Sequence, residues 1–600
     1  MADYQHKPDQ GPGAERQFFI YMILAFLMVL LFQGIFFKQP PAKAPENPPV
    51  ASKPPTPTTP AAPAPTKTQP APAPASKQAA SEAEIVVEND LYRVTFTNRG
   101  AQVKSWLLKK YQDEKGQPLD LVNQVVAAKM GFPLSLWTYD EGLRKQLREA
   151  MYVATPALAH ITVPALPSAN AHEITFEYSD GHLLVSKKFS FDHSYVISVE
   201  TAVKQDGAPV QAYPAWPAAL GDQVSPGHYA TSRLDWRTPE GVERRVPFEK
   251  NWIRPNRWVA NGDTLHGTYN WAGVSDQYFA AIFMPAEPRS TAVITLHESV
   301  DVAKDPSDPN NKETVKVDAL GVAAGNPNGV TKTSLFAGPK AVDVLDSVHS
   351  NADDGAAARG PDLEGTIDFG FFGIFAKWLF IWLNWTHDHW ISNWGWAIVL
   401  LTVIINLALL PTRISQMKMS LKMQKAQPRL QDINKKYEKY SLRDQEKQQQ
   451  KQKEIMAVYK EEGFNPAGGC LPMLLQLPLL WAFYAVLANT IELRHAPWMW
   501  IRDLSAPDPL HILPILTIVT MVALQQMTPQ AGMDPAQRRM MNIMMPVMFA
   551  GFTWAVSAGL ALYWTVGTVI SLAMQYSINR SVLGREIREL QEKRARKQKK

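Results

Sequence analysis

The stretch that most constrains the fold is residues 464–487, FNPAGGCLPMLLQLPLLWAFYAVL, where a charged segment gives way to an apolar one. Asn465-Pro466 predicts the end of the preceding helix, because proline disfavours helical geometry in the residue before it. Gly468-Gly469 predicts a turn, after which Leu471 begins an apolar run of about 20 residues, enough to cross hydrocarbon. Two prolines and Gln476 interrupt this run, which favours a bundle with a polar interior over a lone span.

Further apolar runs separated by polar stretches indicate a polytopic membrane protein. The chain has 600 residues with 18 Trp and 21 Met, and its single cysteine, Cys470, excludes an intramolecular disulfide and a cysteine-based zinc site. The prediction is six transmembrane helices, of which the last four lie within 464–577. These helices are expected at residues 18–37, 391–412, 471–491, 512–527, 543–556 and 560–577.

The chain up to residue 340 divides into an anchor, a linker and a β-domain. Residues 1–37 hold an N-terminal stub and the first span; the apolar run is too long for a cleaved signal peptide, and no A-x-A-like site follows it. Residues 38–83 are proline-rich and predict an extended spacer. Residues 84–340 alternate apolar and polar side chains, and Asp180-Gly181 predicts a hairpin turn, so we expect an antiparallel β-sandwich.

A catalytic β-domain is the less favoured interpretation. His160, His172, His182 and His193 are available, but no spacing among them commits to a metal or to acid–base chemistry. Surface or strand-end histidines are the simpler expectation.

The sequence of residues 341–390 predicts a connector followed by a helix that lies flat in the headgroup region, on the side of the membrane opposite the cytosol. The stretch from Ile367 to Trp385 is dense in aromatic residues, which favour the headgroup region, but polar residues and glycines interrupt it. A full span is the alternative to an interfacial helix.

Residues 413–463 predict a helical hairpin in the cytosol. Leu430, Ile433 and Tyr437 have coiled-coil spacing, and Ser441 with Asp444 resembles a capping box that starts a second helix. Basic residues outnumber acidic ones, most of them expected on a solvated face.

Positive charge fixes the expected topology. The basic hairpin and the basic tail at residues 578–600 favour the cytosol, which places both termini there and residues 38–390 on the opposite side of the membrane. Three interpretations of the tail stay open, namely binding to ribosomal RNA, binding to anionic lipid, and a charge cluster that only sets topology.

Polar side chains recur at helical spacing on several spans and predict a shared hydrophilic groove. An ordinary helix-to-helix hydrogen bond is the alternative for Asn406, and a charged flank at the helix end is the alternative for Arg413. The candidate groove residues are Thr402, Asn406 and Arg413 on the second span, Gln476 and Tyr484 on the third, and Thr568, Ser571 and Gln575 on the sixth.

Three segments resemble the YidC/Oxa/Alb membrane protein insertase family, in its long Gram-negative form. The junction at 465–478 resembles the family's third helix, residues 492–516 resemble the loop that follows, and residues 557–575 resemble its last helix. The resemblance implies five helices forming an insertase core beside a periplasmic β-sandwich. Two positions depart from it, since relatives usually carry arginine where Asn406 stands and asparagine where Thr568 stands.

The resemblance implies a chaperone of the bacterial inner membrane, with residues 38–390 in the periplasm. It implies that this chaperone inserts nascent integral membrane proteins, alone or with the Sec translocon. Membrane lipids, and the ribosome through the hairpin and tail, are the further partners expected. No P-loop or nucleophile elbow occurs in the sequence, so no nucleotide hydrolysis and no cofactor are expected. Two rivals stay open. One is a small-molecule transporter, although no internal repeat supports it, and the other is a membrane-anchored periplasmic sugar-binding protein.

Overall fold

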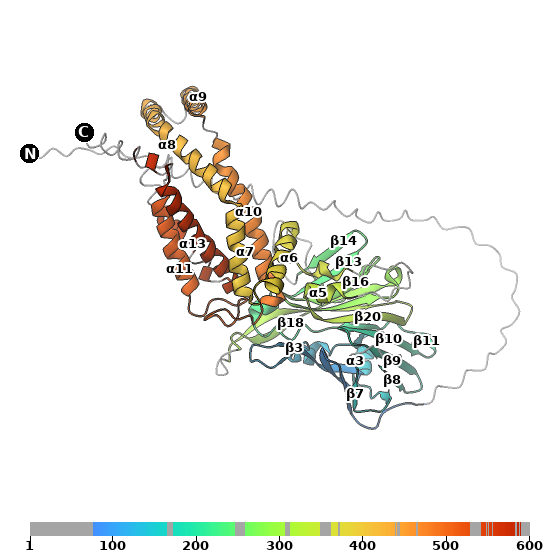
Figure 1. Ribbon diagram of the computed structural model, residues 1–600. Helices are drawn as coiled ribbons and strands as arrows, with labels where there is room; N and C mark the ends of the chain where they lie inside the picture. Colours follow the sequence, from blue (N-terminus) through green and yellow to red (C-terminus); the bar gives the residue numbers. More distant parts are fainter. Residues whose placement is uncertain are drawn as a thin grey trace, which may run out of the picture.

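The structure is a computed structural model that describes residues 76–164, 172–246, 259–306, 312–348, 362–369, 373–438, 440, 444–463, 466–528 and 542–547, and most residues from 549 to 589. The predicted first span at 18–37 and most of the predicted linker lie outside these residues. In the described part, a β-domain lies at one end of a helical bundle, and a helical hairpin projects from the other end (Figure 1).

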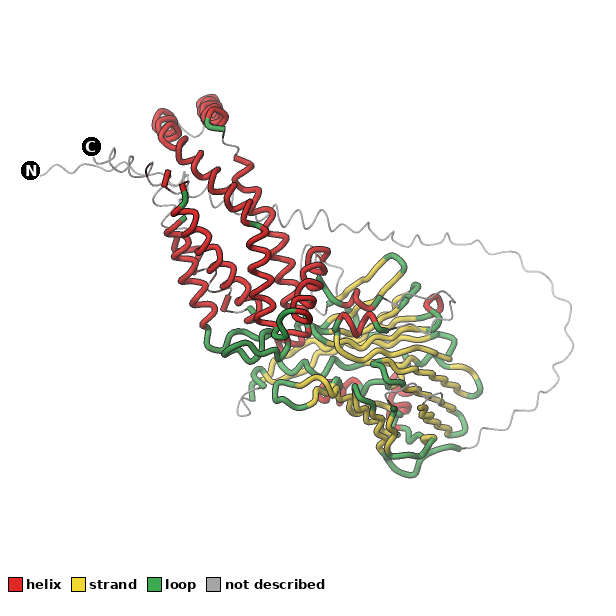
Figure 2. The backbone as a smooth tube through the Cα atoms, viewed as in Figure 1, coloured by secondary structure: helices red, strands yellow, loops and turns green. Residues whose placement is uncertain are grey.

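The β-domain is built from three sheets (Figure 2). In spatial order the first contains β4 (Pro118–Asp120), β3 (Gln102–Gln112), β2 (Tyr92–Thr97), β1 (Glu84–Glu88) and β7 (His160–Thr162). The third contains β15 (Asp263–His266), β18 (Ala292–Ala303), β19 (Thr314–Gly325), β12 (Tyr213–Trp216) and β5 (Ser135–Trp137).

The second sheet is the largest, with ten strands. Its strands run in the order β14 (Gly241–Arg245), β13 (Arg233–Thr238), β16 (Trp271–Ser275), β17 (Phe279–Pro285), β20 (Val330–Pro339), β10 (Val196–Gln205), β9 (Leu183–Phe191), β8 (His172–Ser179) and β6 (Val153–Thr155), with β11 (Ala208–Pro209) beside β10. Short helices decorate the sheets, namely α2 (Gln124–Met130), α3 (Glu141–Glu149), α4 (Pro226–Tyr229), η1 (Pro288–Ser290), α5 (Val342–Asp346) and η2 (Leu363–Thr366).

The predicted alternation and hairpin are confirmed. Strands β8 and β9 pair antiparallel, and Gly181 between them takes φ 95°, a conformation that glycine adopts without strain. One pairing, β1 with β7, is parallel. The last residues of the predicted linker belong to the β-domain. Lys77 forms an isolated antiparallel β-bridge with Ser179, and the Ala79 amide donates to Met151 O.

The bundle begins with α6 (Gly373–His389), which packs on α7 (Trp394–Ala408) and α10 (Pro466–Asn489). Its outer face exposes a row of large apolar side chains that includes Trp378, Trp382 and Trp385, as an interfacial helix requires. Gly395 lets α7 approach the loop between α10 and α11 closely, because an added Cβ would lie 2.2 Å from the Trp498 ring. The predicted turn at Gly468-Gly469 is wrong, since α10 already begins at Pro466 and runs through both glycines.

The predicted hairpin is formed by α8 (Leu410–Glu438) and α9 (Gln445–Glu461), which pack through Ala426, Leu430 and Val458. Pro411 lies in the first turn of α8, where a missing amide donor costs nothing, so the chain passes from α7 into α8 with little interruption. Asp444 is the N-cap of α9, and its side chain accepts a hydrogen bond from the Lys447 amide. The predicted capping box placed Asp444 three residues after the N-cap instead. The other half of that prediction, Ser441, lies outside the described residues.

The remaining helices of the bundle are α11 (Ile512–Met527) and α13 (Ala558–Arg580), and η3 (Ile491–Leu493) lies between α10 and α11. Residues 542–547 of the predicted fifth span are helical, and only part of the rest is described. Among the described helices, α13 alone is long and apolar enough to cross a membrane by length and composition, and α7, α11 and residues 478–489 are shorter apolar helices.

A buried lysine fastens two sheets of the β-domain together. Lys187 on β9 is fully buried and donates to the carbonyl oxygens of Gly100, Ala101 and Leu134, at 3.0, 2.6 and 2.7 Å. Ala101 and Leu134 both have positive φ, so the ammonium stabilises a backbone conformation that side chains disfavour. Burial lowers the pKa of Lys187, whose charge is offset by the three carbonyl dipoles.

Replacing this ammonium is expected to destabilise the β-domain. Lys187→Met leaves three buried carbonyl oxygens without a donor and should cost about 3 kcal/mol or more of unfolding free energy. Urea unfolding of the full chain in detergent, followed by tryptophan fluorescence, measures it. Lys188→Met is the matched control, because its neighbouring side chain pairs with Glu173 at the surface. Equal stability of the two variants would contradict the role given to Lys187.

Candidate functional site

The polar row on α7 is partly satisfied within its own helix. Thr402 is fully buried and its hydroxyl donates to Ile398 O at 2.6 Å. Asn406 is half-buried, and its amide nitrogen donates to Thr402 O at 2.8 Å. In the described part of the chain its amide oxygen has no partner, so Asn406 keeps an acceptor available at this position.

Arg413 lies inside the bundle rather than on its flank. It sits in the first turn of α8, is half-buried, and is close enough to the Tyr563 hydroxyl on α13 for the two groups to interact electrostatically. Tyr563 in turn stacks on Phe483 of α10, with ring centroids 4.0 Å apart. The guanidinium therefore lies where α8, α10 and α13 converge, and no carboxylate pairs with it among the described residues.

The polar row on α13 is used mainly for packing. Thr568 contacts Thr520 of α11 with the hydroxyl oxygens 2.9 Å apart, and one turn earlier Thr565 contacts Thr517 at 2.7 Å. Ser571 donates to Gly567 O in its own helix. These threonine pairs join α11 to α13, so the Thr568 hydroxyl takes part in a helix-to-helix contact.

The end of α13 continues this junction. The Gln575 amide donates to Asn579 Oδ1 at 2.8 Å, and the Asn579 amide donates to Met527 O at the end of α11. Sequence analysis missed Thr517, Thr520, Thr565 and Asn579. The spacing of Thr517 and Thr520 by three residues on an apolar span was the signal that could have revealed them.

Of the two candidate residues on α10, only Tyr484 has a described side chain, and no contact joins it to the polar rows of α7 and α13 in the described part of the chain. Tyr484 is 42% exposed beside Trp481, while its neighbour Phe483 is buried against Tyr563. The Gln476 side chain lies outside the described residues. Among the candidate groove residues, Asn406 keeps an unpaired amide oxygen and Arg413 has no paired carboxylate in the described part of the chain. Thr402 accepts the Asn406 amide through its backbone carbonyl.

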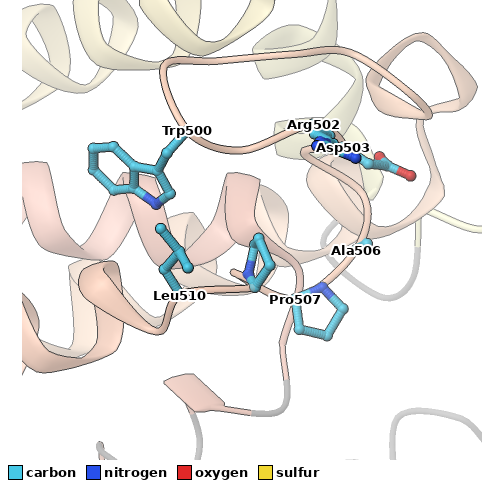
Figure 3. A pocket seen from close by; sticks show the side chains of 7 residues that line it. Trp500, Arg502, Asp503, Ala506, Pro507 and Leu510 are labelled. Carbon is cyan, nitrogen blue, oxygen red and sulfur yellow. The ribbon is translucent and has the colours of Figure 1, made fainter.

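A hollow of about 480 Å³ lies far from these residues, in the loop between α10 and α11 (Figure 3). Trp500, Leu510 and Pro507 form its apolar side, and Arg502 lies at its edge. Asp508 shapes the loop by accepting from Trp500 Nε1 at 3.0 Å and from the Leu513 amide at 2.7 Å. This loop packs at the Gly395 end of α7, so Arg413 lies about 27 Å away by helical rise.

The histidines of the β-domain form no site in the described residues. His182 Nδ1 lies 2.8 Å from Asp206 Oδ1 on an exposed turn, and His160 lies 3.9 Å from Glu88. No group of three His, Cys, Asp or Glu side chains in the described ranges could hold a metal ion. The geometry offers no support for catalysis there.

The threonine pairs make a testable contribution to helix association. Thr520→Val and Thr568→Val together should show a coupling of about 0.6 kcal/mol, and at most about 2, because the two hydroxyls satisfy each other in an apolar surrounding. A double-mutant cycle on thermal unfolding in detergent measures it. Thr528→Val combined with Thr568→Val is the control, since Thr528 bonds only to Leu524 O in its own helix. Strict additivity of the first pair would contradict the contact.

Comparisons with known proteins cover both parts of the chain. A family model described as the YidC periplasmic domain matches residues 84–382, and one described as 60Kd inner membrane protein matches residues 385–585. A crystal structure of active YidC insertase, with its first transmembrane domain resolved, shares 20% identity at a TM-score of 0.32. It aligns with 84% of this chain and 94% of that chain.

Curated relatives match over most of their length. The chain is 30% identical over 524 residues to the membrane protein insertase YidC of Bordetella avium, which covers 84% of each chain. It is 32% identical over 502 residues to the membrane protein insertase YidC of Geobacter sulfurreducens, covering 82% of this chain and 85% of the relative. Together with a β-domain followed by a helical bundle, these matches show that the chain belongs to the YidC family.

Proposed function

We propose that this protein is a membrane protein insertase of the bacterial inner membrane, and not an enzyme. The names of its curated relatives support this function, as does the bundle with polar positions inside apolar helices. Arg413, Asn406 and Thr402 form the polar side of its path, and Gln476, Tyr484, Thr568, Ser571 and Gln575 are the further lining residues that we propose. The substrates are nascent integral membrane proteins.

The observation that carries the proposal is the half-buried guanidinium of Arg413. Three cations of the exposed hairpin have acidic partners, since Lys425 pairs with Glu586, Arg429 with Glu461 and Lys436 with Glu454. Arg413 has none in the described part of the chain, although it lies deeper. A half-buried cation without a carboxylate is suited to attract an acidic segment from outside the protein.

In this proposal, the polar path lowers the free-energy barrier to moving a charged tail across the bilayer, and no nucleotide hydrolysis is needed. A substrate helix gains about 0.3 to 0.6 kcal/mol for each Leu-like residue that enters the bilayer. A charged tail that crosses the bilayer centre costs about 2.5 to 3.5 kcal/mol per charge. A guanidinium and a free amide acceptor inside the bundle offset part of that cost, and the apolar helix of the substrate then leaves along α10 into lipid.

We further propose six spans, with the hairpin and both termini in the cytosol and the β-domain in the periplasm. The β-domain and the α8–α9 hairpin lie at opposite ends of the bundle, which supports opposite sides of one membrane (Figure 1). Glu586 pairs with Lys425 at 2.6 Å and places the start of the basic tail against α8. Hairpin and tail are both rich in basic residues, and we propose that they bind the phosphates of a ribosome. For large substrates, the Sec translocon is the proposed partner.

Arg413→Ala is expected to reduce insertion of a short single-span protein with an acidic tail at least tenfold, because the cation that attracts the tail is lost. Arg413→Lys should retain most activity, and Arg429→Ala on the exposed hairpin is the matched control. Liposomes containing the purified full chain, with protease protection of the tail as readout, measure it. A substrate with a neutral tail should be affected less.

Asn406→Leu separates hydration from charge in the same assay. If Asn406→Leu fails while Arg413→Ala inserts normally, the guanidinium has no role and hydration of the path is decisive. If the wild-type protein inserts no substrate at all, a transporter becomes the better description of the bundle.

A further inference from the structure

The loop between α10 and α11 is held in place by both halves of the protein. Ile491 at the start of the loop is buried in the core of the β-domain, whereas Leu504 is buried in the core of the bundle. The carbonyl oxygens of Leu504 and Ala506 also accept hydrogen bonds from the amides of Gly559 and Ala558 at the start of α13, at 2.8 and 2.7 Å. The loop is therefore a fixed part of the surface of the bundle.

The hollow of about 480 Å³ in this loop is shaped by one buried carboxylate. Asp508 Oδ1 accepts from Trp500 Nε1 at 3.0 Å and from the Leu510 amide at 3.1 Å, and Oδ2 accepts from the Leu513 amide at 2.7 Å. These bonds fix Trp500 and Leu510 on the apolar side of the hollow (Figure 3). A hollow of this size suits a small ligand, and its walls are set before any ligand arrives.

The other side of the hollow carries one cation and one anion (Figure 3). Arg502 is exposed and Asp503 is half-buried, and neither side chain forms an ion pair in the described part of the chain. Asp503 Oδ1 accepts from the amide and the hydroxyl of Ser505, at 2.8 and 2.7 Å, and its Oδ2 has no partner among the described residues. The polar side therefore matches a ligand that carries both charges.

Exposed tryptophans lie at the same level as the hollow. Trp396 in the first turn of α7 is 47% exposed, and its ring centroid lies 5.6 Å from that of Trp498, which in turn lies 5.4 Å from that of Trp500. Trp554 is 48% exposed and stacks on His511 at the end of the loop, with ring centroids 4.2 Å apart. Tryptophans favour the depth at which hydrocarbon meets the headgroups, so the hollow opens at that depth.

We propose that this hollow binds one phospholipid of the leaflet on the β-domain side, with a phosphate and a primary ammonium in its headgroup, as in phosphatidylethanolamine. The Arg502 guanidinium donates to the phosphate, and Asp503 Oδ2 accepts from the ammonium. The first carbons of the acyl chains cover Trp500 and the exposed side chain of Leu510. This ligand rests on the membrane placement given under the proposed function, and not on the insertion of substrates.

The charges of the hollow select this headgroup over the other common ones. A headgroup with only a negative charge brings its phosphate to Arg502 but leaves Asp503 facing an anion. A choline headgroup has a positive charge but no N–H group to donate to the carboxylate. A lipid held here fixes the depth of the α10–α11 loop at the membrane surface, at the level where the β-domain meets the bundle.

Native mass spectrometry of the full chain, released from detergent micelles, tests the lipid site. Phosphatidylethanolamine should bind about tenfold more tightly than phosphatidylcholine with the same acyl chains, because the N–H bonds to Asp503 are lost with choline. Arg502→Ala should weaken both lipids about tenfold, because both carry the phosphate. Asp503→Asn should remove the preference for phosphatidylethanolamine and leave the binding of phosphatidylcholine unchanged.

Matched variants control for the loss of a charge elsewhere on the surface. Arg429→Ala lies on the exposed hairpin, and Asp388→Asn removes an exposed acid of α6 at the β-domain end of the bundle. Both should bind the two lipids as the wild type does. Equal binding of phosphatidylethanolamine by the wild type and Arg502→Ala, or a preference that survives Asp503→Asn, would overturn the proposal.

Two further measurements identify the ligand and its place. Phosphatidylethanolamine with a photoreactive group on the acyl chain should label residues 498–511 of the wild type, and this labelling should be lost in Arg502→Ala. Labelling that maps only to other segments contradicts the site. Free phosphoethanolamine, which has no acyl chain, should not displace the lipid at equal concentration, and displacement would assign the hollow to a soluble phosphate instead. None of these readouts depends on insertion activity, so the failure of one proposal is distinguishable from the failure of the other.

Discussion

A polar group inside an apolar bundle must find a partner, and this constraint orders the helical half of the protein. Thr402, Thr517 and Thr565 satisfy it with hydroxyl bonds to a backbone carbonyl or to another threonine, which lets α7, α11 and α13 pack closely. Arg413 differs from these threonines, because its guanidinium carries several donors and pairs with no carboxylate in the described part of the chain. The path that we propose for substrates therefore begins at the Arg413 guanidinium.

Much of the architecture could be predicted from sequence, because its signals are local. Alternation of side chains along a strand predicted the β-domain, and the Asp180-Gly181 turn fixed one hairpin. The boundaries of the helices were less accurate. A proline followed by a glycine pair predicted a turn before the third span, yet α10 begins at that proline and runs through the glycines, since the first helical position tolerates proline.

The candidate site could be predicted only in part, because helical spacing says which residues share a face but not what that face meets. Thr568 and Gln575 do share a face of α13, and that face packs on α11 and its end. Tyr484 lies one residue from the buried Phe483 and points elsewhere. For Arg413 the sequence left a flank and a groove open, and its place near Tyr563 of α13 depends on tertiary packing that no local pattern records.

The placement of Ile491 has a consequence for the order in which the protein matures. Its side chain completes the core of the β-domain, although every strand of that domain precedes it in the chain by a long interval. During synthesis the sheets can therefore form with a vacancy that only the chain beyond α10 can fill. The β-domain can therefore reach its final packing only after the chain through α10 has been synthesised, so completion of its core depends on the start of the bundle.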